Sequence, residues 1–177
     1  MMKPADIIGV LGNIFFSKAV TWAAGDGLIS HVGLVLCTDP LAIVIESVNP
    51  EVRTIPLDQA IQHHTRVFLM KALTLTDEER KTIIREACKW SAADYSFAKC
   101  IWTQLDEVTK STWFSEHMPS SENPECAWMV SEAYKAAGKY FGGTTSTYNG
   151  PNTILRFAQS HPQFFQVLKL KDDNPSA

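Results

Sequence analysis

Residues 30–48 read SHVGLVLCTDPLAIVIESV and decide the fold, because they combine two apolar segments with a turn signal between them. The segments 30–37 and 42–48 are dominated by Val, Ile and Leu, which favours two buried strands. Thr38, Asp39 and Pro40 form the turn signal. The stretch therefore predicts an antiparallel hairpin within a sheet.

Two ionisable residues, His31 and Glu46, interrupt these otherwise apolar strands. A turn centred between Thr38 and Asp39 places His31 directly opposite Glu46, on one face, with Cβ atoms about 5 Å apart. A buried carboxylate needs a partner because its desolvation is costly, and an imidazole N–H supplies one. The pair predicts either a catalytic histidine oriented by a carboxylate or a structural ion pair, and the hairpin alone leaves both interpretations open.

The remaining segments predict an α+β fold around this hairpin, since a run of strands is followed by helices that can pack on it. The length of 177 residues suits a single domain, residues 1–171, with a polar tail at 172–177. Hydrophobic periodicity, turn signals and a capping box at residues 76–79 define the elements. Strands are expected at 5–10, 52–55, 66–73 and 164–170, helices at 13–24, directly after Pro56, at 76–92, 97–108, 126–137 and 151–159, and an irregular loop at 110–124.

Cys126 begins an amphipathic helix directly after Pro124 and Glu125. Backbone N–H groups and the positive end of the helix dipole at such a position favour a thiolate and can bind an oxyanion. A thiol in this setting, with a histidine and a carboxylate elsewhere in the chain, is typical of a cysteine nucleophile, although a buried helix residue is the alternative. The other cysteines lack this setting and are expected to be core residues with free thiols: Cys37, Cys88 and Cys100.

Composition and motifs exclude several classes of function. The net charge is −3 and no basic stripe interleaves with aromatic residues, so no nucleic-acid partner is expected. No segment approaches the roughly 20 apolar residues of a membrane span, and no zinc-ligand spacing is present, so neither a metal nor a cofactor is expected. Residues 1–6 lack the features of a secretory signal, which predicts a cytoplasmic chain unless the sequence is trimmed or a phage releases it by lysis. His63 and His64 are expected to be exposed.

Two segments resemble the NlpC/P60 superfamily. Residues 30–35, SHVGLV, are similar to its histidine strand, and residues 126–138, CAWMVSEAYKAAG, are similar to its cysteine helix. The histidine strand precedes the cysteine helix here, as in the circularly permuted YiiX/YebB-like branch, whose opening strand residues 5–8 also resemble. The resemblance spans residues 5–170. It implies a circularly permuted papain-like fold, with an antiparallel sheet or partial barrel packed against helices.

The same resemblance implies a Cys-His-polar triad and amide hydrolysis, often of peptidoglycan stem peptides. On this basis Cys126 is the nucleophile, His31 the general base and Glu46 the orienting residue of a cysteine peptidase or amidase that acts through a thioester. Tyr95 occupies the position of a family tyrosine beside the cysteine, and Trp113 and Trp128 are further candidates for substrate binding. Family members often carry a hydroxyl or small polar residue after the cysteine, whereas this chain has Ala127 and then Trp128.

Two other functions stay open. One is a lipid acyltransferase or esterase on the same triad, as the related lecithin:retinol acyltransferase-like proteins imply, since Trp113, Phe114 and Trp128 would suit an acyl chain. The other is a papain-like fold kept as a binding module without catalysis. The expected ligand is a small peptide or an acyl compound. The bond cleaved and the oligomeric state do not follow from the sequence.

Overall fold

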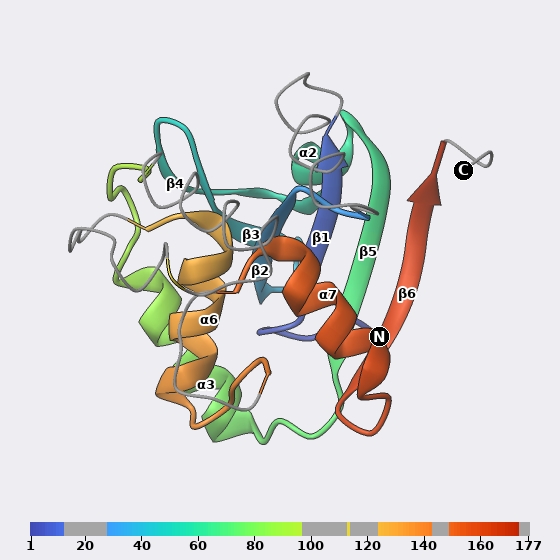
Figure 1. Ribbon diagram of the computed structural model, residues 1–177. Coiled ribbons are helices and arrows are strands. Elements are labelled where there is room, and N and C mark those ends of the chain that lie inside the picture. Colours follow the sequence, from blue (N-terminus) through green and yellow to red (C-terminus); the bar gives the residue numbers. More distant parts are fainter. Residues whose placement is uncertain (13–27, 97–112, 114–123, 143–148, 174–177) are drawn as a thin grey trace.

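A computed structural model describes residues 1–12, 28–96, 113, 124–142 and 149–173 (Figure 1). Its strands form one antiparallel six-stranded sheet in the order β4-β3-β2-β1-β5-β6. The strands are β1 (Ile7–Gly12), β2 (His31–Cys37), β3 (Ile43–Val48), β4 (Glu51–Pro56), β5 (His64–Ala72) and β6 (Phe165–Asp172). The helices are α2 (Leu57–Ile61), α3 (Asp77–Cys88), α6 (Cys126–Ala136) and α7 (Pro151–Ser160).

The predicted α+β class is confirmed, and each strand and helix above overlaps the segment predicted for it, although α3 ends at Cys88 and not at about residue 92. The capping box is formed: the Thr76 hydroxyl accepts a hydrogen bond from the Glu79 N–H, and the Glu79 carboxylate accepts one from the Thr76 N–H. Strand β6 continues to Asp172, the first residue of the predicted tail. The helices expected at 13–24 and 97–108, and the loop at 110–124 except Trp113 and Pro124, lie outside the described residues.

The predictions of burial and pairing for the cysteines are only partly correct. Cys37, Cys88 and Cys126 form no disulfide within the described residues, as expected, and Cys126 is buried. Cys88 is exposed, so its assignment to the core is wrong. It is the last residue of α3, and its side chain lies at the exposed end of that helix. Cys37 is half-buried at the end of β2, and Cys100 lies outside the described residues.

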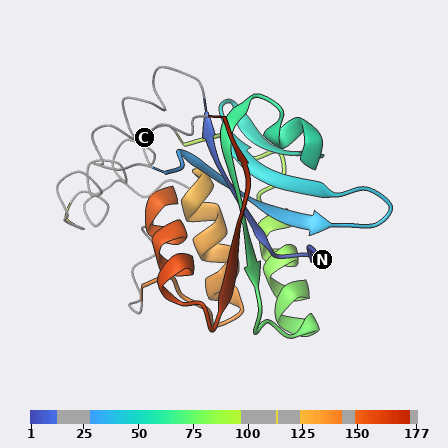
Figure 2. The ribbon, with the colours of Figure 1, turned by 90° about the vertical axis from the view of Figure 1, so that its right-hand side faces the viewer.

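Two core clusters lie on opposite faces of the sheet, because side chains alternate along each strand. Figure 2 shows α6 and α7 on one side of the sheet and α2 on the other. The larger cluster joins alternate strand residues such as Val32, Leu34 and Ile45 to α3, α6 and α7. The smaller cluster joins Val35, Val44 and their neighbours to α2.

Two buried polar contacts anchor α6 and α3 near the start of β1. The Tyr134 hydroxyl, in the second half of α6, donates a hydrogen bond to the Ala5 carbonyl at 2.6 Å. Arg80 of α3 pairs with Asp6 at 3.2 Å, with both side chains buried. Since β1 and β2 are antiparallel, the first half of α6 then runs toward the opposite end of the sheet, where β2 begins.

The β2–β3 pairing places Glu46 opposite Gly33, so the prediction that it directly opposes His31 is wrong. The register is offset by two residues because the connection 38–42 is longer than a two-residue turn and the ladder is irregular between Val35 and Cys37. An offset of two preserves the face of every side chain, whereas an offset of one would have reversed it. His31 is therefore a diagonal neighbour of Glu46 on the same face.

Gly33 provides the space across which this diagonal contact forms. A Cβ atom there would lie 2.9 Å from Val44 Cγ1, 3.0 Å from the Ile45 carbonyl oxygen and 3.3 Å from Glu46 Cβ. The first two distances are too short for packing without movement of β3. Gly33 is thus required by the close approach of the two strands.

We expect Gly33→Ala to lower the free energy of unfolding by about 1–3 kcal/mol, because it overpacks a tight strand pair. Chemical denaturation with an unchanged m-value measures this loss. A variant as stable as the wild type would contradict the tight β2–β3 approach.

Candidate active site

A buried carboxylate, Glu46, lies between a histidine and an arginine. Its Oε2 accepts a hydrogen bond from His31 Nε2 at 3.0 Å, and its Oε1 accepts from Arg53 Nε at 2.9 Å and Nη2 at 2.8 Å. Arg53 is the direct partner of Glu46 in the β3–β4 ladder. An ionised carboxylate only accepts hydrogen bonds, so Nε2 of His31 carries the proton. This tautomer leaves Nδ1 as the ring nitrogen that can accept a proton.

The two partners keep Glu46 ionised although only 4% of it is exposed. Burial by itself raises the pKa of the Glu46 carboxyl. The hydrogen bond and charge of His31, followed by those of Arg53, outweigh burial and lower the pKa to about 2. At neutral pH the carboxylate is therefore charged, as an imidazole-orienting group requires.

The first turn of α6 is capped by Glu125, whose side chain is buried. Its Oε2 accepts a hydrogen bond from the Ala127 N–H at 3.0 Å, and its Oε1 accepts one from the Trp128 N–H at 2.6 Å. The Cys126 thiol donates to Oε2, with Sγ 3.4 Å away. The expectation that these helix amides face a thiolate is therefore wrong, because the preceding carboxylate already occupies them.

The start of α6 and the His31–Glu46 pair lie at the same end of the sheet. Ser47, next to Glu46, donates from its hydroxyl to the Pro124 carbonyl at 3.0 Å, so β3 holds the residue just before the helix. Protonation of His31 would also act on the Glu125 carboxyl by its charge. The fold thus places all three predicted catalytic residues in one region of the structure.

The predicted packing of the helix start against the face of the pair is wrong. His31 and Glu46 alternate with the residues of the larger cluster and so lie on the face of the smaller one. Cys126 belongs to the larger cluster, on the face covered by α6. Cys126 and His31 therefore belong to opposite faces of the sheet, near the end where β2 begins.

The predicted substrate-binding residues have different surroundings. Tyr95 is half-buried, and its N–H donates to the Pro50 carbonyl at 2.7 Å, which holds the residues around it near β4. Trp128 packs edge-on against Trp90, with ring centroids 5.0 Å apart, and so helps to join α6 to the end of α3. Trp113 is 54% exposed. Phe114 lies outside the described residues.

Three further polar residues belong to this region but were not expected there. Glu125 could have been found from its position, since a carboxylate directly before a helix is a capping signal. Arg53 could have been found only from the β3–β4 register. His64 is half-buried at the start of β5, so its predicted exposure is wrong; burial lowers its pKa, and its Nδ1 has no hydrogen-bond partner within the described residues.

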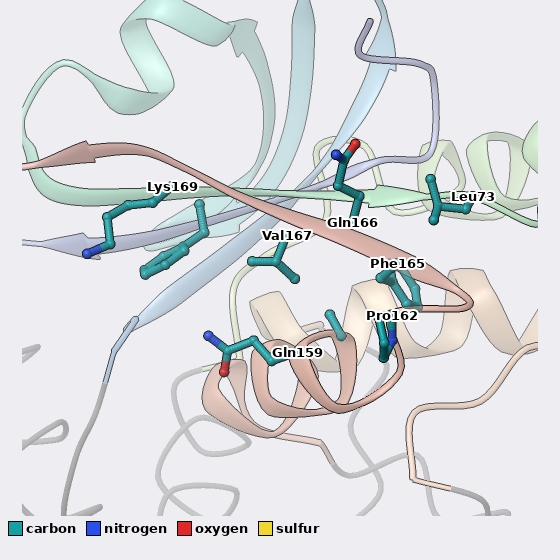
Figure 3. Close-up of a pocket in the computed structure, with 9 residues that line it drawn as sticks. Leu73, Gln159, Pro162, Phe165, Gln166, Val167 and Lys169 are labelled. Carbon is teal, nitrogen blue, oxygen red and sulfur yellow. The ribbon is translucent and has the colours of Figure 1, made fainter.

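A pocket of about 700 Å³ lies between α7 and β6, apart from the residues above. Figure 3 shows Phe165 and Val167 of β6 facing Gln159 and the Pro162 turn, while Gln166 points away from α7. Its lining is mainly apolar and includes none of the predicted catalytic residues. The pocket is therefore separate from the chemistry of Cys126, His31 and Glu46.

No group of three or more His, Cys, Asp or Glu side chains in the described ranges could hold a metal ion. In that part of the chain, no helix combines the length and the apolar character that a membrane span requires.

The fold has a counterpart among solved structures. The crystal structure of the metalloprotein yiiX from Escherichia coli O157:H7 (DUF1105) superposes with a TM-score of 0.68 and 18% sequence identity, over 98% of this chain and 99% of that chain. This likeness confirms the fold implied by the YiiX/YebB-like resemblance, which is papain-like α+β. No protein-family model matches the sequence, and no curated protein matches it.

The lowered pKa of Glu46 predicts a specific acid sensitivity. Its contribution to stability is fully present above the ordinary value of 4.5 and is lost as the pH falls toward about 2. As the pH is lowered between these limits, we expect the unfolding free energy of the wild type to fall by on the order of 2–3 kcal/mol more than that of Glu46→Gln. Acid titrations of the unfolding free energy measure this difference. Glu132→Gln, which removes a carboxylate from the more exposed Lys135 pair, is the control. Equal acid slopes for wild type and Glu46→Gln would show that Glu46 is not held as described.

Proposed function

We propose that this chain is a cysteine hydrolase that cleaves an amide bond, with Cys126 as nucleophile, His31 as general base and Glu46 as the residue that orients His31. The observation that supports this most is the ionised, buried Glu46, which fixes the tautomer of His31 at the end of the sheet where α6 begins. A thiol, an imidazole and a carboxylate placed in this order are what a cysteine nucleophile needs.

The proposed reaction proceeds in two steps through a thioester. Nδ1 of His31 takes the proton from Sγ, and the sulfur electron pair forms a bond to the amide carbonyl carbon. The protonated imidazole then donates its proton to the leaving amine as the C–N bond breaks. Water, deprotonated by the same nitrogen, hydrolyses the thioester and restores the thiol.

Stabilisation of the oxyanion needs donors other than the next two helix amides. The N–H groups of Ala127 and Trp128 are directed at Glu125. The donors we assign are therefore the Cys126 N–H and the Tyr95 hydroxyl. Trp113 and Trp128 are proposed to contact the substrate on either side of this position.

The substrate class follows from the resemblance and not from the geometry. We propose a small peptide, with peptidoglycan stem peptides as the first compounds to test. A lipid ester or acyl-transfer substrate would use the same three residues, and substrate specificity is not fixed by the fold. An assay that offers amides and esters in parallel separates the two.

Substitutions in the triad should remove activity without unfolding the protein. We expect Cys126→Ala and His31→Ala each to lower kcat/KM by roughly 10³-fold or more, and the double variant to be no worse, because the pair acts as a unit. Glu46→Gln should cost less, since it keeps a hydrogen-bond partner for the ring. Rates on the amide and ester panel, with thermal melts, measure this.

Cys88→Ala provides the matched control, because it removes an exposed thiol on another helix. Wild-type activity in a folded Cys126→Ala protein would refute the mechanism. A wild type that turns over none of the substrates would favour the binding module instead.

A further inference from the structure

The side chain of Glu125 contacts the reacting sulfur and is more buried than the nucleophile itself. Glu125 is 2% exposed and Cys126 is 5% exposed. The Sγ–Oε2 distance is 3.4 Å, and the two carboxyl oxygens also receive the N–H groups of Ala127 and Trp128. A helix cap needs neither this degree of burial nor a contact with the thiol.

We propose that Glu125 shares the thiol proton of Cys126, so that the resting site holds a neutral thiol and not a thiolate–imidazolium pair. The inference rests on the proposed function in one respect, the identity of Cys126 as the nucleophile. It adds a catalytic residue, Glu125, whose carboxyl group touches the reacting atom.

The electrostatic reason is that two acids at hydrogen-bond distance cannot both ionise in a buried site. Loss of both protons would place two negative charges side by side in a low dielectric, so the pair retains one proton. Burial raises the pKa of the Glu125 carboxyl, against the backbone hydrogen bonds and the charge of His31. The helix amides that would stabilise a thiolate are already bonded to the carboxyl group.

Among the described residues, His31 on β2 is the group whose protonation would act on Glu125, and its Nε2 is bonded to Glu46 on β3, which Arg53 on β4 also neutralises. In the resting site the imidazole holds one proton, on Nε2, so the Cys126–Glu125 pair keeps its own proton.

This arrangement assists attack although it disfavours the free thiolate. When the S–H bond breaks, the proton goes to Nδ1 of His31 and the electron pair stays on sulfur beside Glu125. As the S–C bond forms, that charge moves to the carbonyl oxygen, and the repulsion from Glu125 is relieved. A thiolate of higher basicity is also the stronger nucleophile.

The test is the ionisation of the single thiol in a protein carrying Cys37→Ser, Cys88→Ser and Cys100→Ser. Thiolate absorbance and the rate of iodoacetamide alkylation are followed against pH, in the absence of substrate. With Glu125 present, we expect the thiol to ionise above the ordinary value of about 8.5. In Glu125→Gln and Glu125→Ser the midpoint should fall by about one unit or more, with about tenfold faster alkylation near neutral pH.

The two variants control for different defects. Gln preserves the volume of the side chain, whereas Ser is itself a strong helix cap and removes only the carboxylate. The alkylation rate at high pH reports access to the sulfur separately from its ionisation. Glu132→Gln removes the same charge from the same helix and should leave the midpoint unchanged.

Either of two results would overturn the proposal: a thiol that ionises below neutral pH with Glu125 present, or a midpoint that is unchanged in the folded variants. The first result is measured on the protein that retains Glu125, so this test remains valid even when a Glu125 variant does not fold. If the protein turned over no substrate but its thiol titrated as expected, only the proposed function would be contradicted. If it turned over substrate but its thiol did not titrate as expected, only this inference would be contradicted.

Discussion

The carboxylate of Glu46 is the constraint around which the rest of the structure is arranged. A buried charge is tolerated only when it is fully hydrogen-bonded, and here three donor atoms from two neighbouring strands meet that condition. Gly33 must lack a side chain for β3 to approach β2 closely enough. Arg53 must lie opposite Glu46 on β4. The buried carboxylate of Glu46 thus depends on the register of β2, β3 and β4, on a glycine at position 33 and on a proton at Nε2 of His31.

The position of Cys126 depends on a second set of contacts. Tyr134 anchors the second half of α6 near the start of β1, and Ser47 holds Pro124 at the other end. Between these points the helix can place Cys126 only at the end of the sheet where β2 begins. In the proposed mechanism two carboxylates act in opposite ways: Glu46 would stabilise the imidazolium that forms, and Glu125 would oppose a charged sulfur.

The sequence predicted the elements well because burial and capping are local signals. Apolar strands 30–37 and 42–48, the capping box at Thr76 and the helix that starts at Cys126 were all readable from residue pattern. The register of His31 and Glu46 was not, since it depends on the length of the connection 38–42 and on an irregular ladder beside it. The side-chain direction of Glu125 and the pairing of Arg53 depend on tertiary contacts, which periodicity does not encode.

The ring of His31 provides the most direct test that the pair and the thiol form one site. Long-range ¹H–¹⁵N correlation spectra of the imidazole, recorded on the single-thiol protein before and after alkylation of Cys126, report the tautomer and the environment of each nitrogen. We expect Nε2 to carry the proton, bonded to Glu46, and alkylation to shift the Nδ1 resonance. A proton on Nδ1, or a ring unaffected by alkylation of Cys126, would contradict this arrangement.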